Sequence, residues 1–294
     1  MSRCNLYKAS IYMTLYAVSQ SIVWALVRAL SEDLSTSTLF FFRNVIGFLT
    51  VLPLFVNKGN TVLSTNNLGI HVIRAFAAFA GGLCIFYSLA IVPLTTVVAI
   101  TFTAPIFASL MACLFLKETM NKPQFISLLF GFIGTLIVLR PNLNTEFEGV
   151  LFALFAALLT AVAFLTVKKL SATDNSDTIV AYPFILILPL SAVMANWDWT
   201  TPNLMQVPLL IIMGLGISFA QYCMVKAFSL ADASAVLPID FLRLIIASFI
   251  GVIYFNDHLD LWAVAGGIVI LASSLNLIFK KNKATLTPPN EVAK

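Results

Sequence analysis

The chain has 294 residues, of which 60% are hydrophobic and only 10% charged, and its mean hydropathy is +0.97. Soluble domains carry about a quarter charged residues because their surface is in water. This composition therefore excludes a soluble enzyme and leaves no room for a soluble catalytic domain. The net charge of +4 comes from an uneven distribution of Lys and Arg among the loops and does not indicate nucleic-acid binding.

Apolar blocks follow one another along almost the whole chain, and each is long enough to cross a bilayer as a helix. Hydrocarbon offers no hydrogen bonds to the backbone, so each crossing has to be a helix bonded within itself. The sequence therefore predicts an all-α polytopic membrane protein with ten transmembrane helices. They are expected at 11–30, 38–55, 68–89, 95–116, 124–139, 149–170, 178–195, 207–230, 233–255 and 261–279.

Lys and Arg in the loops predict the orientation, because cations near span ends are retained on the cytoplasmic side. With the N-terminus inside, the cytoplasmic segments hold Arg3, Lys8, Lys58, Lys117, Lys122, Lys168, Lys169, Lys280, Lys281, Lys283 and Lys294. The outer segments hold one clear cation, Arg140, against Glu32, Asp33, Glu146, Glu148, Asp198, Asp257 and Asp260. We expect both termini in the cytoplasm.

The two halves of the chain share a pattern at an offset of 139 residues. Three positions of the first half match three of the second: Glu118 with Asp257, Ser127 with Gly266, and Gly134 with Ser273. Five spans in each half would turn the second half upside down relative to the first. Such inverted repeats occur in secondary transporters, with substrate near the midplane. We expect repeats at 1–140 and 149–283, followed by a cytoplasmic tail at 284–294.

The chain resembles the drug/metabolite transporter superfamily, and within it the EamA-type ten-helix carriers. The residues that carry the resemblance are Phe42-Arg43-Asn44, Tyr87-Ser88-Leu89-Ala90, Pro105, Leu116-Lys117-Glu118, Gly131-Phe132-Ile133-Gly134, Leu139-Arg140-Pro141, Gly149-Val150-Leu151 and Lys168-Lys169-Leu170. The second half departs from the pattern, since Asp257 stands for the usual Glu and no Gly precedes it. The resemblance implies a carrier without a cofactor.

In length, termini and overall sequence the chain also looks like the S-adenosylmethionine uptake carriers of obligate intracellular bacteria. This resemblance implies uptake of S-adenosylmethionine across the bacterial inner membrane, in exchange for S-adenosylhomocysteine. No motif specifies that substrate. An EamA-type carrier of another small metabolite, such as an amino acid, is the alternative, for uptake or for efflux.

Ionisable residues inside predicted spans are candidate binding residues, because burying them in hydrocarbon costs free energy. Arg43 lies about five residues into the second span and could hold a carboxylate through two hydrogen bonds; snorkelling to the interface is the structural alternative. Asp240 and Arg243 are spaced i, i+3 near Pro238 in the ninth span, so they share a face. They form either an internal ion pair or a site for a substrate of mixed charge.

Three aromatic residues within spans, Trp24, Tyr87 and Tyr222, are candidates to stack on a purine or to hold a cation. Gln20 and Gln221 are possible amide partners. Because the chain holds 25 Phe, 7 Tyr and 4 Trp, any one aromatic residue is more often a core or lipid-facing residue. Three other polar residues are expected to snorkel to the cytoplasmic side: His71, Arg74 and Lys226.

Three functional classes remain after this reading: a secondary carrier, a membrane-embedded enzyme and a membrane scaffold. The only two histidines, His71 and His258, belong to no metal-binding or nucleophile motif. No Walker A motif is present, so a gradient has to supply the energy of transport. We expect no catalytic residue, metal or cofactor, and the partners are a small-molecule substrate and the lipid bilayer.

Overall fold

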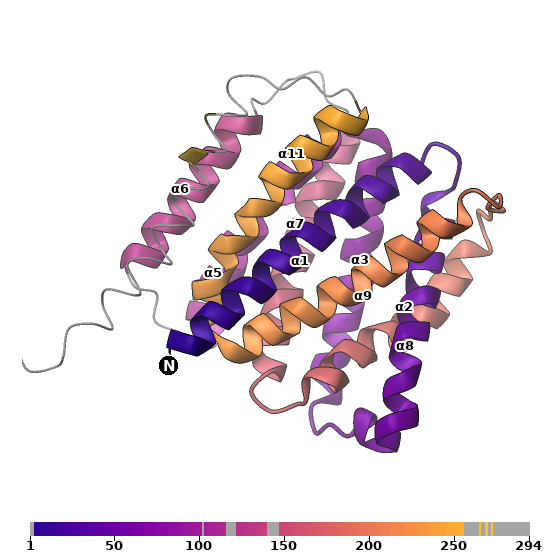
Figure 1. The fold of residues 1–294 in the computed structure, drawn as a ribbon, viewed down its shortest axis with the longest axis horizontal. Helices are drawn as coiled ribbons and strands as arrows, with labels where there is room; N and C mark the ends of the chain where they lie inside the picture. Colours follow the sequence, from indigo (N-terminus) through magenta and orange to yellow (C-terminus); the bar gives the residue numbers. More distant parts are fainter. Residues whose placement is uncertain are drawn as a thin grey trace, which may run out of the picture.

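A computed structural model of the chain describes residues 3–101, 103–115, 122–139 and 147–255, together with Ala265, Ile268, Val269 and Ala272. The described residues form helices and contain no strand, which confirms the all-α prediction for this part of the chain (Figure 1). The elements are α1 (Arg3–Leu30), α2 (Thr36–Lys58), η1 (Gly59–Leu63), α3 (Leu68–Ile91), α4 (Leu94–Thr101), α5 (Thr103–Phe115), α6 (Lys122–Leu139), α7 (Phe147–Leu170), α8 (Ser176–Ala195), α9 (Val207–Leu230), α10 (Ala233–Val236), η2 (Leu237–Phe241) and α11 (Leu242–Phe255).

Six of these helices, α1, α2, α3, α7, α8 and α9, are long and apolar enough to cross a membrane. They correspond to the first, second, third, sixth, seventh and eighth expected spans. The fourth is described as α4 and α5 and the fifth as α6. The tenth expected span, the acids of the repeat pattern (Glu118 and Asp257) and the tail lie outside the described residues, apart from the four separate positions in the tenth span. The chain is a multi-pass membrane protein.

The expected ninth span is interrupted. After the short α10, the chain makes the 3₁₀ segment η2, with a proline in its first turn, and continues as α11. Proline cannot donate a backbone hydrogen bond and disfavours α geometry in the residue before it. The continuous helix expected at 233–255 was therefore wrong, and Asp240 and Arg243 lie on either side of the junction between η2 and α11.

The long helices pair in a regular pattern across the two halves of the chain. Helix α1 packs against α9, α3 against α7, and α2 against α8, while α11 contacts both α1 and α4. Figure 1 shows α1 and α9 running side by side. A methyl group added at Gly47 would lie within 2.2 Å of the Phe184 ring, and one at Gly214 within 2.4 Å of Ile46. Glycines thus allow the close helix packing that is common in membrane proteins.

Candidate functional site

The break in the ninth span places a buried ion pair beside the first helix. Arg243 Nη2 donates to Asp240 Oδ2 over 2.9 Å, and the two side chains are 2% and 0% exposed. The Arg243 guanidinium lies 4.6 Å from the ring centroid of Trp24 on α1. The Ser21 hydroxyl donates to the backbone carbonyl of Arg243 at 3.2 Å. This junction therefore contacts α1 through a cation–π contact with Trp24 and a hydrogen bond from Ser21.

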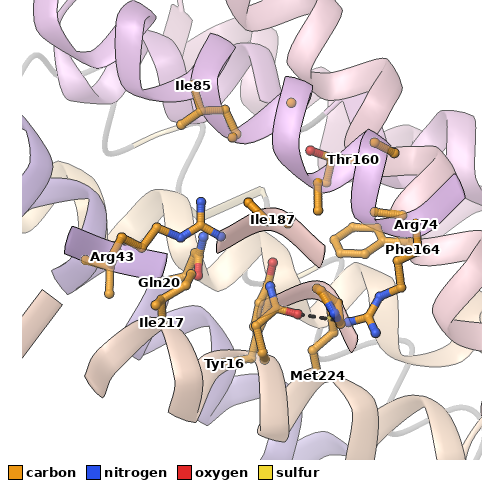
Figure 2. A pocket seen from close by; sticks show the side chains of 18 of the residues that line it. Tyr16, Gln20, Arg43, Arg74, Ile85, Thr160, Phe164, Ile187, Ile217 and Met224 are labelled. Atoms are coloured by element: carbon orange, nitrogen blue, oxygen red, sulfur yellow. Dashed lines mark hydrogen bonds between the residues drawn. The ribbon is translucent and has the colours of Figure 1, made fainter. Parts of the chain in front are cut away.

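A cavity with a volume of about 970 Å³, including the space open at its mouth, lies between the two halves of the chain. Its wall comes from α1, α2, α3, α7, α8 and α9, with single residues from α4 and α11. Three arginines line it, Arg43, Arg74 and Arg243, and Figure 2 shows the first two from opposite sides. Its uncharged polar lining consists of Tyr16, Gln20, Asn44, Thr101, Thr160 and Gln221.

Arg43 reaches the cavity from α2 and is 8% exposed. Its guanidinium carbon lies 4.9 Å and 5.6 Å from the ring centroids of Phe40 and Phe86. Among the described residues it makes no ion pair, and its Nε is buried without a hydrogen-bond partner. Buried charges are normally paired, so this guanidinium is available to an anionic group that enters the cavity.

Arg74 reaches the same cavity from α3 and is 2% exposed. Its Nη1 donates to the backbone carbonyl of Ile179 on α8, and its Nη2 to Gln221 Oε1 on α9 at 3.2 Å. Both acceptors are neutral. The prediction that Arg74 snorkels to the cytoplasmic side was wrong, because its side chain is buried among α3, α8 and α9.

Of the seven candidate binding residues, four line the cavity: Trp24, Arg43, Gln221 and Arg243. A fifth, Asp240, is joined to the site by its ion pair with Arg243. The remaining two lie on the outer surface of the bundle. Tyr87 is 39% exposed and packs on Phe152, and Tyr222 is 38% exposed beneath the Lys226 ammonium. The structure does not bring these two tyrosines to the site.

Several residues that line the cavity were not predicted from the sequence: Tyr16, Arg74, Phe86, Thr160 and Phe164. One pattern could have found Arg74. Small residues follow it at Ala77, Ala78, Gly81 and Gly82, on the helix face that residues three, four, seven and eight apart share. All of them line the cavity. Because these small side chains leave space beside α3, a cation on the same helix face can be expected to border that space.

A polar network closes one end of the bundle, where α3 and α8 begin. The Asp174 carboxylate accepts hydrogen bonds from Thr65, Asn67, His71 and Thr173. Partial burial raises the pKa of Asp174, but these hydrogen bonds outweigh it and lower the pKa to about 2. The carboxylate is thus ionised at neutral pH and can only accept, so His71 Nε2, 2.8 Å away, carries the hydrogen.

A second polar network joins the halves at the opposite end, where α1 ends and α2 begins. The backbone N–H of Thr200 donates to the Thr38 hydroxyl at 3.0 Å, and the Ser35 hydroxyl donates to the carbonyl of Asp198. The Gln206 amide donates to Asp33 Oδ2 at 2.9 Å. The cavity therefore lies between two sets of hydrogen bonds that each link the first half to the second.

Comparisons with known proteins agree with this architecture. The sequence matches the EamA-like transporter family over residues 7–140 and 147–279. The S-adenosylmethionine uptake transporter of Rickettsia bellii is 29% identical over 273 residues, which cover 93% of this chain and 94% of the relative. The riboflavin transporter of Brucella anthropi is 32% identical over 272 residues, covering 89% and 93%. One solved crystal structure superposes with a TM-score of 0.76 at 14% identity, covering 92% of this chain and 98% of the other, and shows the fold alone.

Proposed function

We propose, since the chain belongs to the EamA-like transporter family, that it is a secondary carrier that takes up S-adenosylmethionine across the bacterial inner membrane in exchange for S-adenosylhomocysteine. The observation that carries the proposal is one cavity in which an unpaired guanidinium and aromatic rings face the same space. Both adenosyl compounds end in an amino-acid group with a carboxylate, and both carry a flat purine. The Rickettsia relative, named for S-adenosylmethionine uptake, supports the same choice.

In this proposal the substrate carboxylate binds Arg43, the one cavity arginine without a polar partner among the described residues. A guanidinium and a carboxylate can form two parallel hydrogen bonds, which fixes the substrate's orientation. Trp24, Tyr16, Phe86 and Phe164 also line the cavity, and a purine stacks well on such rings. The Asp240–Arg243 pair lies beside Trp24 and supplies the one carboxylate near the cavity among the described residues.

Riboflavin is the second candidate substrate, because the relative named as a riboflavin transporter is 32% identical. The aromatic lining would suit its flat ring system as well. Riboflavin has no carboxylate, however, so binding it would enclose the Arg43 guanidinium without an ionic partner, and such a charge is costly to bury. The guanidinium groups therefore favour a substrate that carries a carboxylate.

We further propose that the chain consists of two inverted five-helix repeats, 1–140 and 149–283, with both termini in the cytoplasm. The crosswise pairing of α1 with α9, α3 with α7 and α2 with α8 supports the inversion, and the loop cations support the orientation. A reporter fused after Lys283 should be active only in the cytoplasm, and one in the loop at 196–206 only outside. The opposite pattern would contradict the orientation.

The test of the proposed function is uptake by the purified full-length carrier in proteoliposomes. We expect saturable accumulation of labelled S-adenosylmethionine, and inhibition by an excess of unlabelled S-adenosylhomocysteine outside. Labelled riboflavin in the same vesicles tests the second candidate. Saturable riboflavin uptake with no response to either adenosyl compound would replace the proposed substrate and leave the family assignment in place.

A further inference from the structure

Arg74 is a buried cation whose protein partners are all neutral. Its side chain is 2% exposed, and within the described part of the chain its donors meet the Ile179 carbonyl and the Gln221 amide oxygen. The nearby carboxylate of Asp174, in the turn between α7 and α8, lies next to His71, which is one turn before Arg74 on α3. Its hydrogen bonds come from Thr65, Asn67, His71 and Thr173. Among the described residues, Arg74 therefore has no ionic partner, although its guanidinium faces the cavity.

Arg43 and Arg74 enter the cavity from opposite ends of the bundle. Arg43 lies seven residues after Thr36, the first residue of α2, and Arg74 six residues after Leu68, the first residue of α3. These separations correspond to roughly 10 Å and 9 Å along each helix. Because α3 begins at the end of the bundle where α2 finishes, the two guanidinium groups stand at different depths. Figure 2 shows them on opposite sides of the cavity, with Gln20 beside Arg43.

The two arginines differ in what an arriving anion has to displace. Among the described residues, Arg43 has ring contacts and no hydrogen-bond acceptor, so an anion can bind it directly. Arg74 is held by α8 through Ile179 and by α9 through Gln221. An anion at Arg74 would replace the amide oxygen of Gln221 and weaken this link between α3 and the second half of the chain. His71, one turn away on α3, contributes to the polar network that closes that end.

We propose that Arg74 is a second anion-binding position, which receives the substrate's carboxylate from Arg43 before release at the end where α3 begins. The proposal rests on the proposed function for the direction of transport and the identity of the substrate. The existence of an anion site at Arg74 does not depend on either.

Binding to the full-length carrier tests the site separately from transport. With Trp197, Trp199 and Trp262 replaced by Phe, Trp24 in the cavity wall becomes the only tryptophan and reports occupancy by its fluorescence. Succinate serves as the probe for anion binding, and S-adenosylhomocysteine as the probe for the proposed substrate. The variants are Arg43→Gln, Arg74→Gln, the double variant, and Lys226→Gln as a control, because Lys226 lies outside the cavity over Tyr222.

Because the two arginines are successive positions for one carboxylate, we expect each single cavity variant to raise the Kd for succinate about twofold, the double variant to raise it at least tenfold, and Lys226→Gln to leave it unchanged. A double variant that binds succinate no worse than Arg43→Gln would overturn the proposal. If succinate shows the expected pattern and S-adenosylhomocysteine does not bind, the anion site stands and the proposed substrate fails.

Gln221→Leu tests the same site through an expected increase in affinity for succinate, and it leaves all three cavity arginines in place. It removes the neutral acceptor that an anion must displace from Arg74, so we expect succinate to bind about threefold more tightly. Unchanged or weaker binding would overturn the proposal, and this variant decides the question if Arg74→Gln does not fold.

Discussion

At the residue scale, the position of Arg43 depends on the missing side chain at Gly82. A methyl group added there would lie 2.6 Å from the Phe40 ring and 2.9 Å from Arg43 Nη1. Both distances are below ordinary van der Waals contact, so either the ring or the guanidinium has to move. The glycine thus leaves room for the cation that the proposed site uses.

We expect Gly82→Ala to reduce stability by roughly 1–3 kcal/mol, as overpacking in a core usually does, and to raise the KM for the transported substrate several-fold. The matched control is Gly69→Ala on the same helix, where an added methyl group meets nothing within 4 Å. Uptake kinetics and thermal unfolding of the two variants check the prediction. An unchanged KM in Gly82→Ala would show that Arg43 does not need its present position.

Variants of the Asp240–Arg243 pair can distinguish a purely structural ion pair from one that also binds the substrate. Removing one partner breaks a buried ion pair and should cost roughly 3–5 kcal/mol. We therefore expect Asp240→Leu and Arg243→Met to lower the amount of folded carrier in the membrane. The double variant should recover the folded amount yet fail to transport, if the pair also meets charges of the substrate. Near-normal uptake by the double variant, normalised to protein in the membrane, would make the pair purely structural.

At the scale of elements, the hydrogen-bond networks at the two ends of the bundle lie where gates of a carrier would be needed. The network around Asp174 joins the segment before α3 to the turn between α7 and α8. The network around Thr38 joins the start of α2 to the segment before α9. Each connects the two halves, so in the proposed transport cycle one network at a time would have to open.

The lowered pKa of Asp174 predicts how the first network depends on pH. A carboxylate with a folded-state pKa of about 2 adds stability that is fully present above its ordinary pKa of about 3.9 and is lost as the pH falls toward 2. Asp174→Asn should therefore lower the melting temperature at neutral pH and lose less stability than the parent between pH 4 and 2. Asp232→Asn is the control, because its 3.8 Å contact with Lys168 is exposed and contributes little. Equal pH profiles for parent and Asp174→Asn would contradict the assignment.

The sequence predicted the long helices well, because a membrane span needs an uninterrupted apolar stretch that can be recognised locally. It did not predict the break within 233–255, although Pro238 was visible, since proline is tolerated in many membrane helices. Among the site residues, Arg43 and the Asp240–Arg243 pair stood out because charges are rare in spans. Tyr87 and Tyr222 had no such signal, and which face of a helix an aromatic residue occupies depends on packing against other helices. Arg74 was misplaced for the same reason.

At the scale of the whole molecule, the described part of the cavity wall holds more cationic than anionic side chains. Within that part, Arg43 and Arg74 have no ionic partner, while Arg243 pairs with Asp240. S-adenosylhomocysteine is neutral overall and S-adenosylmethionine carries one positive charge more. One extra charge about 8 Å from a guanidinium costs roughly 2 kcal/mol at an effective dielectric constant of about 20.

We therefore expect the carrier to bind S-adenosylhomocysteine about thirtyfold more tightly than S-adenosylmethionine. Competition titrations with the two compounds check this ratio, and Arg74→Gln should reduce it. Tighter binding of the sulfonium compound would mean that its positive charge is met by an anionic group that the described cavity wall does not contain.

Counterflow across the membrane of proteoliposomes is a direct test of exchange between the two adenosyl compounds. Vesicles holding the full-length carrier are loaded with unlabelled S-adenosylhomocysteine, and the entry of labelled S-adenosylmethionine is followed. We expect a transient accumulation of label above equilibrium, which Arg43→Gln abolishes and Lys226→Gln leaves intact. Equal accumulation in the parent and in Arg43→Gln, or no accumulation in loaded vesicles, would contradict it.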